Sequence, residues 1–198
     1  MSENKLFELW LGNSVDISKQ LLQNKKNVQS TGDFFFESIL KKYRYNFTQA
    51  DIKKNEHGKP YLPDENISFN MSHCDDQIVM LVCDQEFCGI DIQASKSRKK
   101  FDDALKSVFT DKEQAILNKL NRDSDSFQLW SLKEAYIKAI GSSIWFGRDY
   151  DFSENLPHYS DLWFSSNDLF LYSMKIDSGL FLSIAVPQKP KSLVIKKI

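Results

Sequence analysis

Cysteine, glycine, proline and long apolar runs are all scarce in this chain of 198 residues. The low number of each argues against one class of protein. The three cysteines, Cys74, Cys83 and Cys88, form an odd set without C-x-x-C spacing, which suits a reducing compartment. Seven glycines and five prolines leave no long flexible linker between segments. No stretch approaches the roughly 20 apolar residues of a membrane span, and the start has no signal-peptide pattern. We therefore expect a soluble cytoplasmic protein, without a membrane partner.

Charge of one sign is also lacking, because 26 basic residues stand against 27 acidic ones. The net charge of −1 and the pI of about 6.3 give no global positive field that would attract nucleic acid. Basic runs occur at 41–44 and 95–100. Such runs are typical of solvated surface, although they leave local anion sites open. With no aromatic-basic recognition motif either, we expect no nucleic acid as partner.

What is present is an α+β pattern that occurs twice. Strands are predicted at 6–11, 66–72, 77–84 and 87–93, and again at 168–176 and 179–187, with a polar turn at 73–76. Helices are predicted at 33–47, 101–109, 111–120 and 130–141. We expect two similar halves, 1–86 and 87–198, related by a pseudo-two-fold. Each half would be a small, mostly antiparallel sheet packed with helices, and the site would lie between the halves.

The first segment with chemical content is GIDIQ, at 89–93. Alternation along a strand sends Ile90 and Ile92 into a core and Asp91 and Gln93 to the opposite face. Aspartate is depleted in strands because its side chain competes for backbone hydrogen bonds. Asp91 is therefore either an accident of an edge strand or a placed ligand.

The second segment is the helix WSLKEAYIKAIG, at 130–141. Helical periodicity puts Glu134 and Lys138 one turn apart on one side, together with Trp130 and Ile137. An exposed ion pair between Glu134 and Lys138 explains the two charges, but it does not explain the bulky residues beside them. Gly141 occupies the position expected of a left-handed helix terminator.

The third segment runs from Gly58 to His73. Lys59 lies in a turn between Gly58 and Pro60, and Ser72 and His73 stand at a predicted strand end, where polar groups can converge on a ligand. A histidine in such a place is more often merely exposed.

Taken in order, the motifs GKP (58–60), FNMSH (69–73), GIDIQ (89–93) and WSLKEAYIK (130–138) resemble those of the monomeric, two-half 4′-phosphopantetheinyl transferases. The resemblance covers about residues 58–141. It implies transfer of the phosphopantetheine arm of coenzyme A to a serine of an acyl or peptidyl carrier protein, with release of 3′,5′-ADP. The enzyme would be a monomer that depends on Mg²⁺.

The resemblance also implies roles for residues. Asp91, Gln93 and Glu134 would hold Mg²⁺, and Lys138 would contact the pyrophosphate as a catalytic residue beside Glu134, which would help to deprotonate the carrier serine. Contacts to coenzyme A would come from these residues: Gly58, Lys59, Pro60, Ser72, His73, Asp91, Lys133, Glu134 and Lys138. Upstream basic residues, Lys19, Lys25 and Lys26 among them, are candidates for contact with the 3′-phosphate, but no motif fixes which of them makes it. The basic run at 95–100 and the apolar segment 108–110 would receive the carrier protein.

Gln93 departs from the family pattern, which has glutamate at this position. An amide oxygen can ligate Mg²⁺ but carries no negative charge. Weaker metal binding, a changed preference among divalent cations, and lost activity all remain open outcomes. The alternative function is accordingly a catalytically impaired module that binds coenzyme A or a carrier protein.

Overall fold

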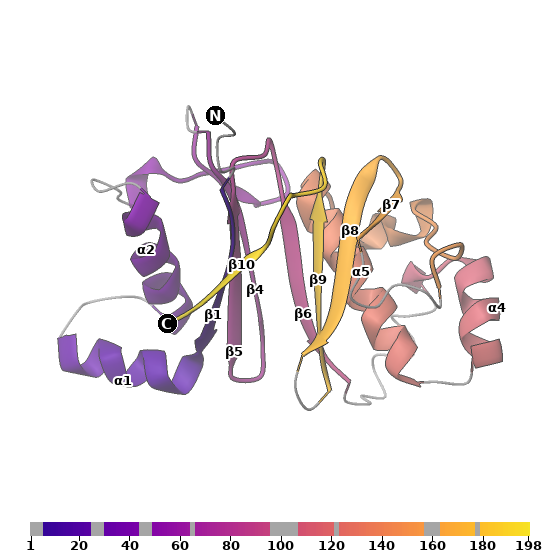
Figure 1. Ribbon diagram of the computed structural model, residues 1–198, viewed down its shortest axis with the longest axis horizontal. Coiled ribbons are helices and arrows are strands. Elements are labelled where there is room, and N and C mark those ends of the chain that lie inside the picture. Colours follow the sequence, from indigo (N-terminus) through magenta and orange to yellow (C-terminus); the bar gives the residue numbers. More distant parts are fainter. Residues whose placement is uncertain are drawn as a thin grey trace.

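The protein folds into four layers, with helices, a first sheet, a second sheet and further helices following one another across the molecule (Figure 1). This computed structural model describes residues 6–24, 30–43, 49–63, 66–95, 107–120, 123–156, 163–176 and 179–198. Three clusters of buried side chains fill the spaces between consecutive layers. The predicted α+β class is confirmed. None of the helices in these ranges combines the length and the apolarity needed to cross a membrane.

The first sheet has the strand order β10-β1-β5-β4. Its strands are β1 (Phe7–Asn13), β4 (Ser68–Cys74), β5 (Gln77–Cys83) and β10 (Val194–Lys197). β1, β5 and β4 pair antiparallel, whereas β10 runs parallel to β1. The turn between β4 and β5 is tighter than predicted. Only Asp75 and Asp76 form it, and Asp75 takes a positive φ of 51°.

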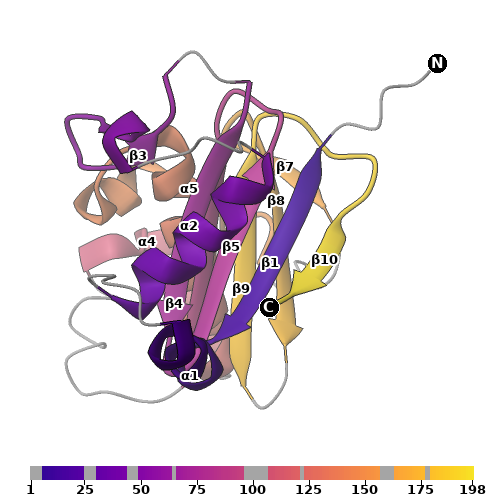
Figure 2. The ribbon, with the colours of Figure 1, turned by 90° about the vertical axis from the view of Figure 1, so that its left-hand side faces the viewer.

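Two helices cover the outer face of this sheet. Asn13 starts α1 (Ser14–Asn24), because its side-chain oxygen accepts a hydrogen bond from the amide of Val15 at 3.0 Å. α2 (Thr31–Tyr43) crosses the sheet diagonally and buries an apolar face against it (Figure 2). The buried residues of α2 are Phe34, Phe35, Phe36, Ile39 and Leu40.

The second sheet is wholly antiparallel among its described strands and has the order β6-β9-β8-β7. Its strands are β6 (Gly89–Ala94), β7 (Phe164–Ser166), β8 (Leu169–Ile176) and β9 (Leu180–Val186). The long helix α5 (Asp123–Ile140) packs on its outer face, and α4 (Asp111–Leu120) and the 3₁₀ helix η2 (Ile144–Asp149) pack beside α5. Gly141 ends α5 with φ of +67°, as its position predicted.

The edge strands β4 and β6 meet through side chains rather than through a backbone ladder. Alternate side chains of β4 each accept a hydrogen bond from a backbone amide of β6. The pairs are Asn70 with Ile90 at 2.9 Å, Ser72 with Ile92 at 3.4 Å, and Cys74 with Ala94 at 3.2 Å. We call this line of contacts the β4–β6 seam. It brings two of the predicted motifs together.

Several elements differ from the sequence-based expectation. α1, β7 and β10 were not predicted, and neither were the short elements η1 (Gln49–Asp51), β2 (Lys53–Lys54) and β3 (Pro60–Tyr61). α5 begins seven residues before the predicted start. Most of the helix predicted at 101–109 lies outside the described residues. The division at 86/87 falls in the connection between β5 and β6 and stays a prediction, as does the pseudo-two-fold.

Candidate functional site

Asp91 of β6 is the centre of the candidate site. Its neighbours Ile90 and Ile92 point into the core between the sheets, so the alternation predicted for this strand is confirmed. The side chain of Asp91 turns the other way, and the residue is only 5% exposed. Its Oδ1 accepts hydrogen bonds from Lys138 Nζ at 2.7 Å and Ser72 Oγ at 2.9 Å. Its Oδ2 is buried and has no hydrogen-bond partner within the described parts of the chain.

α5 supplies the residues that face Asp91. Lys138 Nζ lies 4.0 Å from Glu134 Oε2, one turn earlier, and donates to Ser72 Oγ at 3.2 Å across the seam. Burial raises the pKa of Glu134, the charge of Asp91 adds to the rise, and Lys138 opposes it. The ion pair between Glu134 and Lys138 that the helix spacing predicted is therefore present. It is part of a larger cluster that includes Asp91 and Ser72.

A glycine permits the close approach of α5 to β6 that this cluster needs. A Cβ built on Gly89 would lie 2.5 Å from the backbone nitrogen of Ala139 and far inside van der Waals contact with the carbonyl oxygen of Ala135. Only a residue without a side chain fits between the strand and the helix here. Gly89, the first residue of the GIDIQ motif, thus sets the distance between the two elements that carry the charged groups.

The cluster has the donors that a hard divalent cation prefers. Asp91 and Glu134 are carboxylates, and the unpartnered Oδ2 of Asp91 is an oxygen still able to accept a ligand bond. Gln93, next on the same face of β6, donates from Nε2 to the carbonyl of Ala94 at 3.1 Å. The described residues hold no group of three or more His, Cys, Asp and Glu side chains arranged for a metal. Two carboxylates and one amide make up the candidate set, and the Mg²⁺ site itself stays a prediction.

The GKP turn is tied to the end of α5. The side-chain oxygen of Asn55 accepts hydrogen bonds from the amides of His57 at 3.0 Å and Lys59 at 2.8 Å, while its nitrogen donates to the carbonyl of Gly141 at 3.2 Å. Gly58 adopts φ of +82°, a conformation that favours glycine. Asn55 therefore shapes the turn and fixes its position relative to the second half of the chain.

The ammonium group of Lys59 also links the halves. It donates to the carbonyls of Cys88 at 2.9 Å and Ala139 at 2.8 Å, and burial lowers its pKa. Lys59 and Pro60 line a pocket of about 870 Å³ whose wall includes Phe87 and Gly141 from the second half. The pocket therefore lies between the GKP turn and the end of α5.

His73 and Lys133, two predicted contact residues, belong neither to the cluster nor to the GKP turn. His73 is exposed, and alternation along β4 places it on the face opposite Ser72. Lys133 is wholly buried on another side of α5, where its ammonium group pairs with Glu113 at 2.9 Å. Sequence spacing placed Lys133 beside Glu134, but consecutive helical residues point about 100° apart.

The surface expected to receive a carrier protein is corrected in part. Val108 and Phe109 are buried in the core of the second half, so they offer no apolar surface. Lys19 is exposed on α1 and forms an ion pair with Asp16 at 3.2 Å. Lys25, Lys26 and residues 96–100 lie outside the described residues.

Sequence reasoning missed three residues that build the site. Asn55 and Asn70 were overlooked as acceptors, although Asn70 stands inside the FNMSH motif. The sequence could have predicted the position of Glu113 at the start of a helix, because Thr110 and Glu113 have the spacing of a capping box. Nothing in the sequence indicated the ion pair of Glu113 with Lys133, 20 positions later.

Comparison with known proteins agrees with the motifs. The sequence model of the 4′-phosphopantetheinyl transferase superfamily matches residues 87–162. The phosphopantetheinyl transferase of Thraustochytrium sp. is 30% identical over 127 residues, covering 55% of this chain and 44% of that protein. The transferase gsp of Aneurinibacillus migulanus is 34% identical over 118 residues, covering 55% and 48%. Sfp of Bacillus subtilis is 30% identical over 119 residues, covering 57% and 51%.

These matches confirm the resemblance that the four motifs predicted. The chain spans about half the length of the curated relatives it matches.

Proposed function

We propose that this chain, which belongs with the 4′-phosphopantetheinyl transferases through its residues 87–162, moves the phosphopantetheine arm of coenzyme A onto a serine of a carrier protein. The observation that carries the proposal is the meeting of Asp91, Glu134 and Lys138 at the β4–β6 seam, with Asp91 Oδ2 left unpartnered. Attack of a hydroxyl on a pyrophosphate phosphorus needs positioning and neutralisation of charge. Two carboxylates for a cation and one lysine for the phosphates are suited to that task.

Asp91 and Glu134 would hold Mg²⁺, with Gln93 as a neutral third ligand. The cation would supply charge neutralisation at the pyrophosphate. Lys138 now neutralises Asp91 at 2.7 Å and also lies 4.0 Å from Glu134. With Asp91 and Glu134 engaged as ligands, Lys138 would contact the pyrophosphate and offset charge on the leaving 3′,5′-ADP.

Glu134 is the residue suited to take the proton of the carrier serine. Burial raises the pKa of its carboxyl group in the metal-free protein. Beside the cation, the carboxylate would take up the serine proton directly or through a water. The side chain keeps 21% of its surface exposed, so an incoming hydroxyl or a water can reach it.

The pocket beside Lys59 and Pro60 would hold the nucleotide end of coenzyme A. Its wall includes the end of α5, from Ala139 to Gly141. Ser72, which accepts from Lys138 across the seam, would help to orient the phosphates. His73, exposed on the far face of β4, would contact a phosphate only outside this cluster.

The test is transfer itself. Purified protein, coenzyme A and Mg²⁺ are incubated with a panel of apo carrier proteins, and intact-mass spectrometry follows the gain of one phosphopantetheine group. We expect at least one carrier to be modified, with 3′,5′-ADP released in equal amount and no modification in EDTA. A protein that binds coenzyme A but modifies no carrier would favour the impaired binding module instead.

Gln93→Glu should increase the affinity for Mg²⁺. A third carboxylate beside Asp91 and Glu134 adds a charge interaction of about 1.4 kcal/mol, so the Mg²⁺ concentration for half-maximal rate should fall about tenfold. Without metal the added charge repels its neighbours, and the melting temperature should drop. Titration of rate against Mg²⁺ and melting with and without the ion measure the two effects.

Gln188→Glu, at an exposed position, is the control for a general effect of charge. A Gln93→Glu variant that matches this control in both assays would show that residue 93 does not face the cation.

The remaining expectations are part of the same proposal. We propose a cytoplasmic monomer built from two halves with pseudo-two-fold symmetry, acting on an acyl or peptidyl carrier protein. Cys74, Cys83 and Cys88 form no disulfide with one another.

A further inference from the structure

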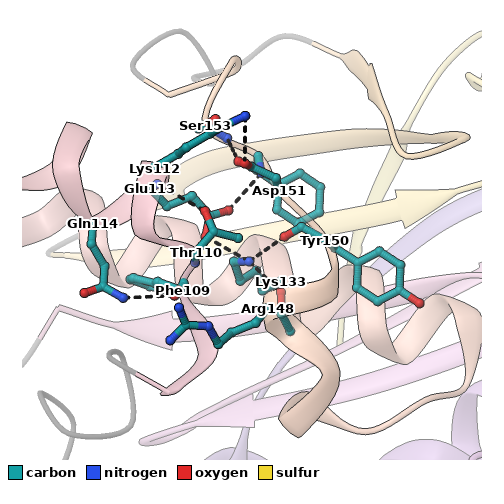
Figure 3. Close-up of polar contacts among 12 residues, drawn as sticks. Phe109, Thr110, Lys112, Glu113, Gln114, Lys133, Arg148, Tyr150, Asp151 and Ser153 are labelled. Atoms are coloured by element: carbon teal, nitrogen blue, oxygen red, sulfur yellow. Dashed lines mark hydrogen bonds and ion pairs between the residues drawn. The ribbon is translucent and has the colours of Figure 1, made fainter.

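A buried ion pair lies on the side of α5 away from the charged cluster. Lys133 and Glu113 are both 0% exposed, and their charged atoms are 2.9 Å apart (Figure 3). Burial raises the pKa of Glu113 and lowers that of Lys133, and the mutual attraction opposes both shifts. Burying two charges is costly, and apolar residues of similar volume often replace such pairs without loss of stability. Stability alone therefore does not explain the pair.

The pair connects α5 to three other segments. The ammonium group of Lys133 also donates to the carbonyls of Gly147 at 2.7 Å and Tyr150 at 2.6 Å. With Glu113, this makes one acceptor in α4, one in η2 and one just after η2, so all three ammonium protons are used.

Glu113 is held in place as firmly as its partner. It accepts hydrogen bonds from the amides of Thr110 and Phe152, each at 2.8 Å, and its own amide donates to the hydroxyl of Thr110 at 3.2 Å. The carboxylate therefore has no freedom to follow Lys133 if the helix turns. Figure 3 shows Thr110 bonded to Glu113, and Glu113 and Tyr150 both meeting the ammonium group of Lys133.

The residue after Lys133 is Glu134, so any rotation or shift of α5 at Lys133 moves the carboxylate of the charged cluster. On the other side, Gly89 lets α5 touch β6, and Ser131 Oγ donates to the carbonyl of Asp91 at 3.4 Å. The helix is thus fixed by close contact on the strand side and by the ion pair on the outer side.

We infer that Lys133 and Glu113 form a positioning pair, which sets the rotation of α5 so that Glu134 and Lys138 face Asp91. The inference rests on the proposed function, which assigns the cation and the phosphates to Asp91, Glu134 and Lys138. Lys133 acts through Glu134 and touches no part of coenzyme A. This revises the role that the motif implied for Lys133.

The test separates positioning from stability. Lys133→Met and Glu113→Gln each leave one buried charge without its partner, so each should lower the melting temperature. The double variant removes both charges and should recover most of the lost melting temperature. Its kcat should nevertheless stay about 10- to 100-fold below wild type, because a misplaced carboxylate slows the chemistry. Its KM for coenzyme A should stay within about twofold.

Calorimetry gives a readout that does not depend on turnover. Mg²⁺ binding in the presence of coenzyme A should weaken about tenfold in the double variant, because Asp91 and Glu134 no longer meet correctly. Lys133→Arg keeps the charge but replaces a compact ammonium group by a larger planar one. It should fold and lose about tenfold in kcat, and it keeps the test decisive if the double variant does not fold.

A double variant with wild-type kcat and wild-type Mg²⁺ affinity would overturn the inference, and so would a folded Lys133→Arg variant with wild-type kcat. Wild-type protein that modifies no carrier would instead overturn the proposed function. In that case unchanged Mg²⁺ affinity in the double variant would overturn the positioning role as well.

Discussion

Asp91→Asn and Glu134→Gln are each expected to lower the rate of phosphopantetheine transfer about 10²- to 10³-fold. Both substitutions keep the size of the side chain and remove one of the two carboxylates that would hold the cation. Loss of one preorganised electrostatic group in a water-poor site typically costs this much. The rates are compared at saturating coenzyme A, over a range of Mg²⁺ concentrations that extends well above the need of the wild type.

The fold should survive these substitutions. Asp91→Asn leaves an acceptor oxygen for Lys138 and Ser72, and Lys138 keeps 29% of its side chain in contact with solvent. Glu154→Gln, at an exposed position outside the cluster, removes the same charge and should leave the rate unchanged. Transfer at the wild-type rate by Asp91→Asn or Glu134→Gln, with an unchanged circular dichroism spectrum, would refute the shared cation site.

Gly89→Ala should have the largest effect on stability. The added methyl group would collide with the backbone of α5 at Ala135 and Ala139, and neither backbone atom can turn aside as a flexible side chain could. The helix must move off β6, at a cost of about 3 kcal/mol. For a domain of this size the melting temperature should fall by roughly 6–12 °C.

Transfer should be lost along with stability, because the displaced helix carries Glu134 and Lys138. Gly32→Ala is the matched control. Its methyl group would meet nothing closer than 3.7 Å, and alanine favours the helix α2 in which it lies. If Gly89→Ala melts like Gly32→Ala, the close approach of α5 to β6 is not required.

Local periodicity was sufficient to predict which faces of the strand and the helix carry the residues of the candidate site. The alternation of a strand gave the direction of Asp91, and the turn of a helix put Glu134 and Lys138 on one side. Neither rule needs knowledge of the rest of the chain. The meeting of the strand and the helix came instead from the family resemblance, because nothing local says which helix packs on which strand.

The residues that sequence reasoning misjudged depend on long-range packing. Lys133 was placed with coenzyme A because it belongs to the same motif as Glu134, but its environment is set by α4 and η2. Val108 and Phe109 were assigned to the carrier-binding surface together with the basic run at 95–100. They are instead buried in the core between the second sheet and its helices. β10 was not predicted, because the strand with which it pairs, β1, lies at the opposite end of the sequence.

That last pairing has a consequence for folding during synthesis. β4 and β5 can pair with β1 as soon as residue 83 has left the ribosome, but the outer edge of β1 stays uncovered until residues 194–197 arrive. The delay is roughly 110 residues, on the order of ten seconds of translation. During that interval the nascent chain displays an open strand edge, which is a template for pairing with other chains. Chaperone demand should therefore persist through this whole interval, and a chain that stalls before residue 194 should aggregate through β1.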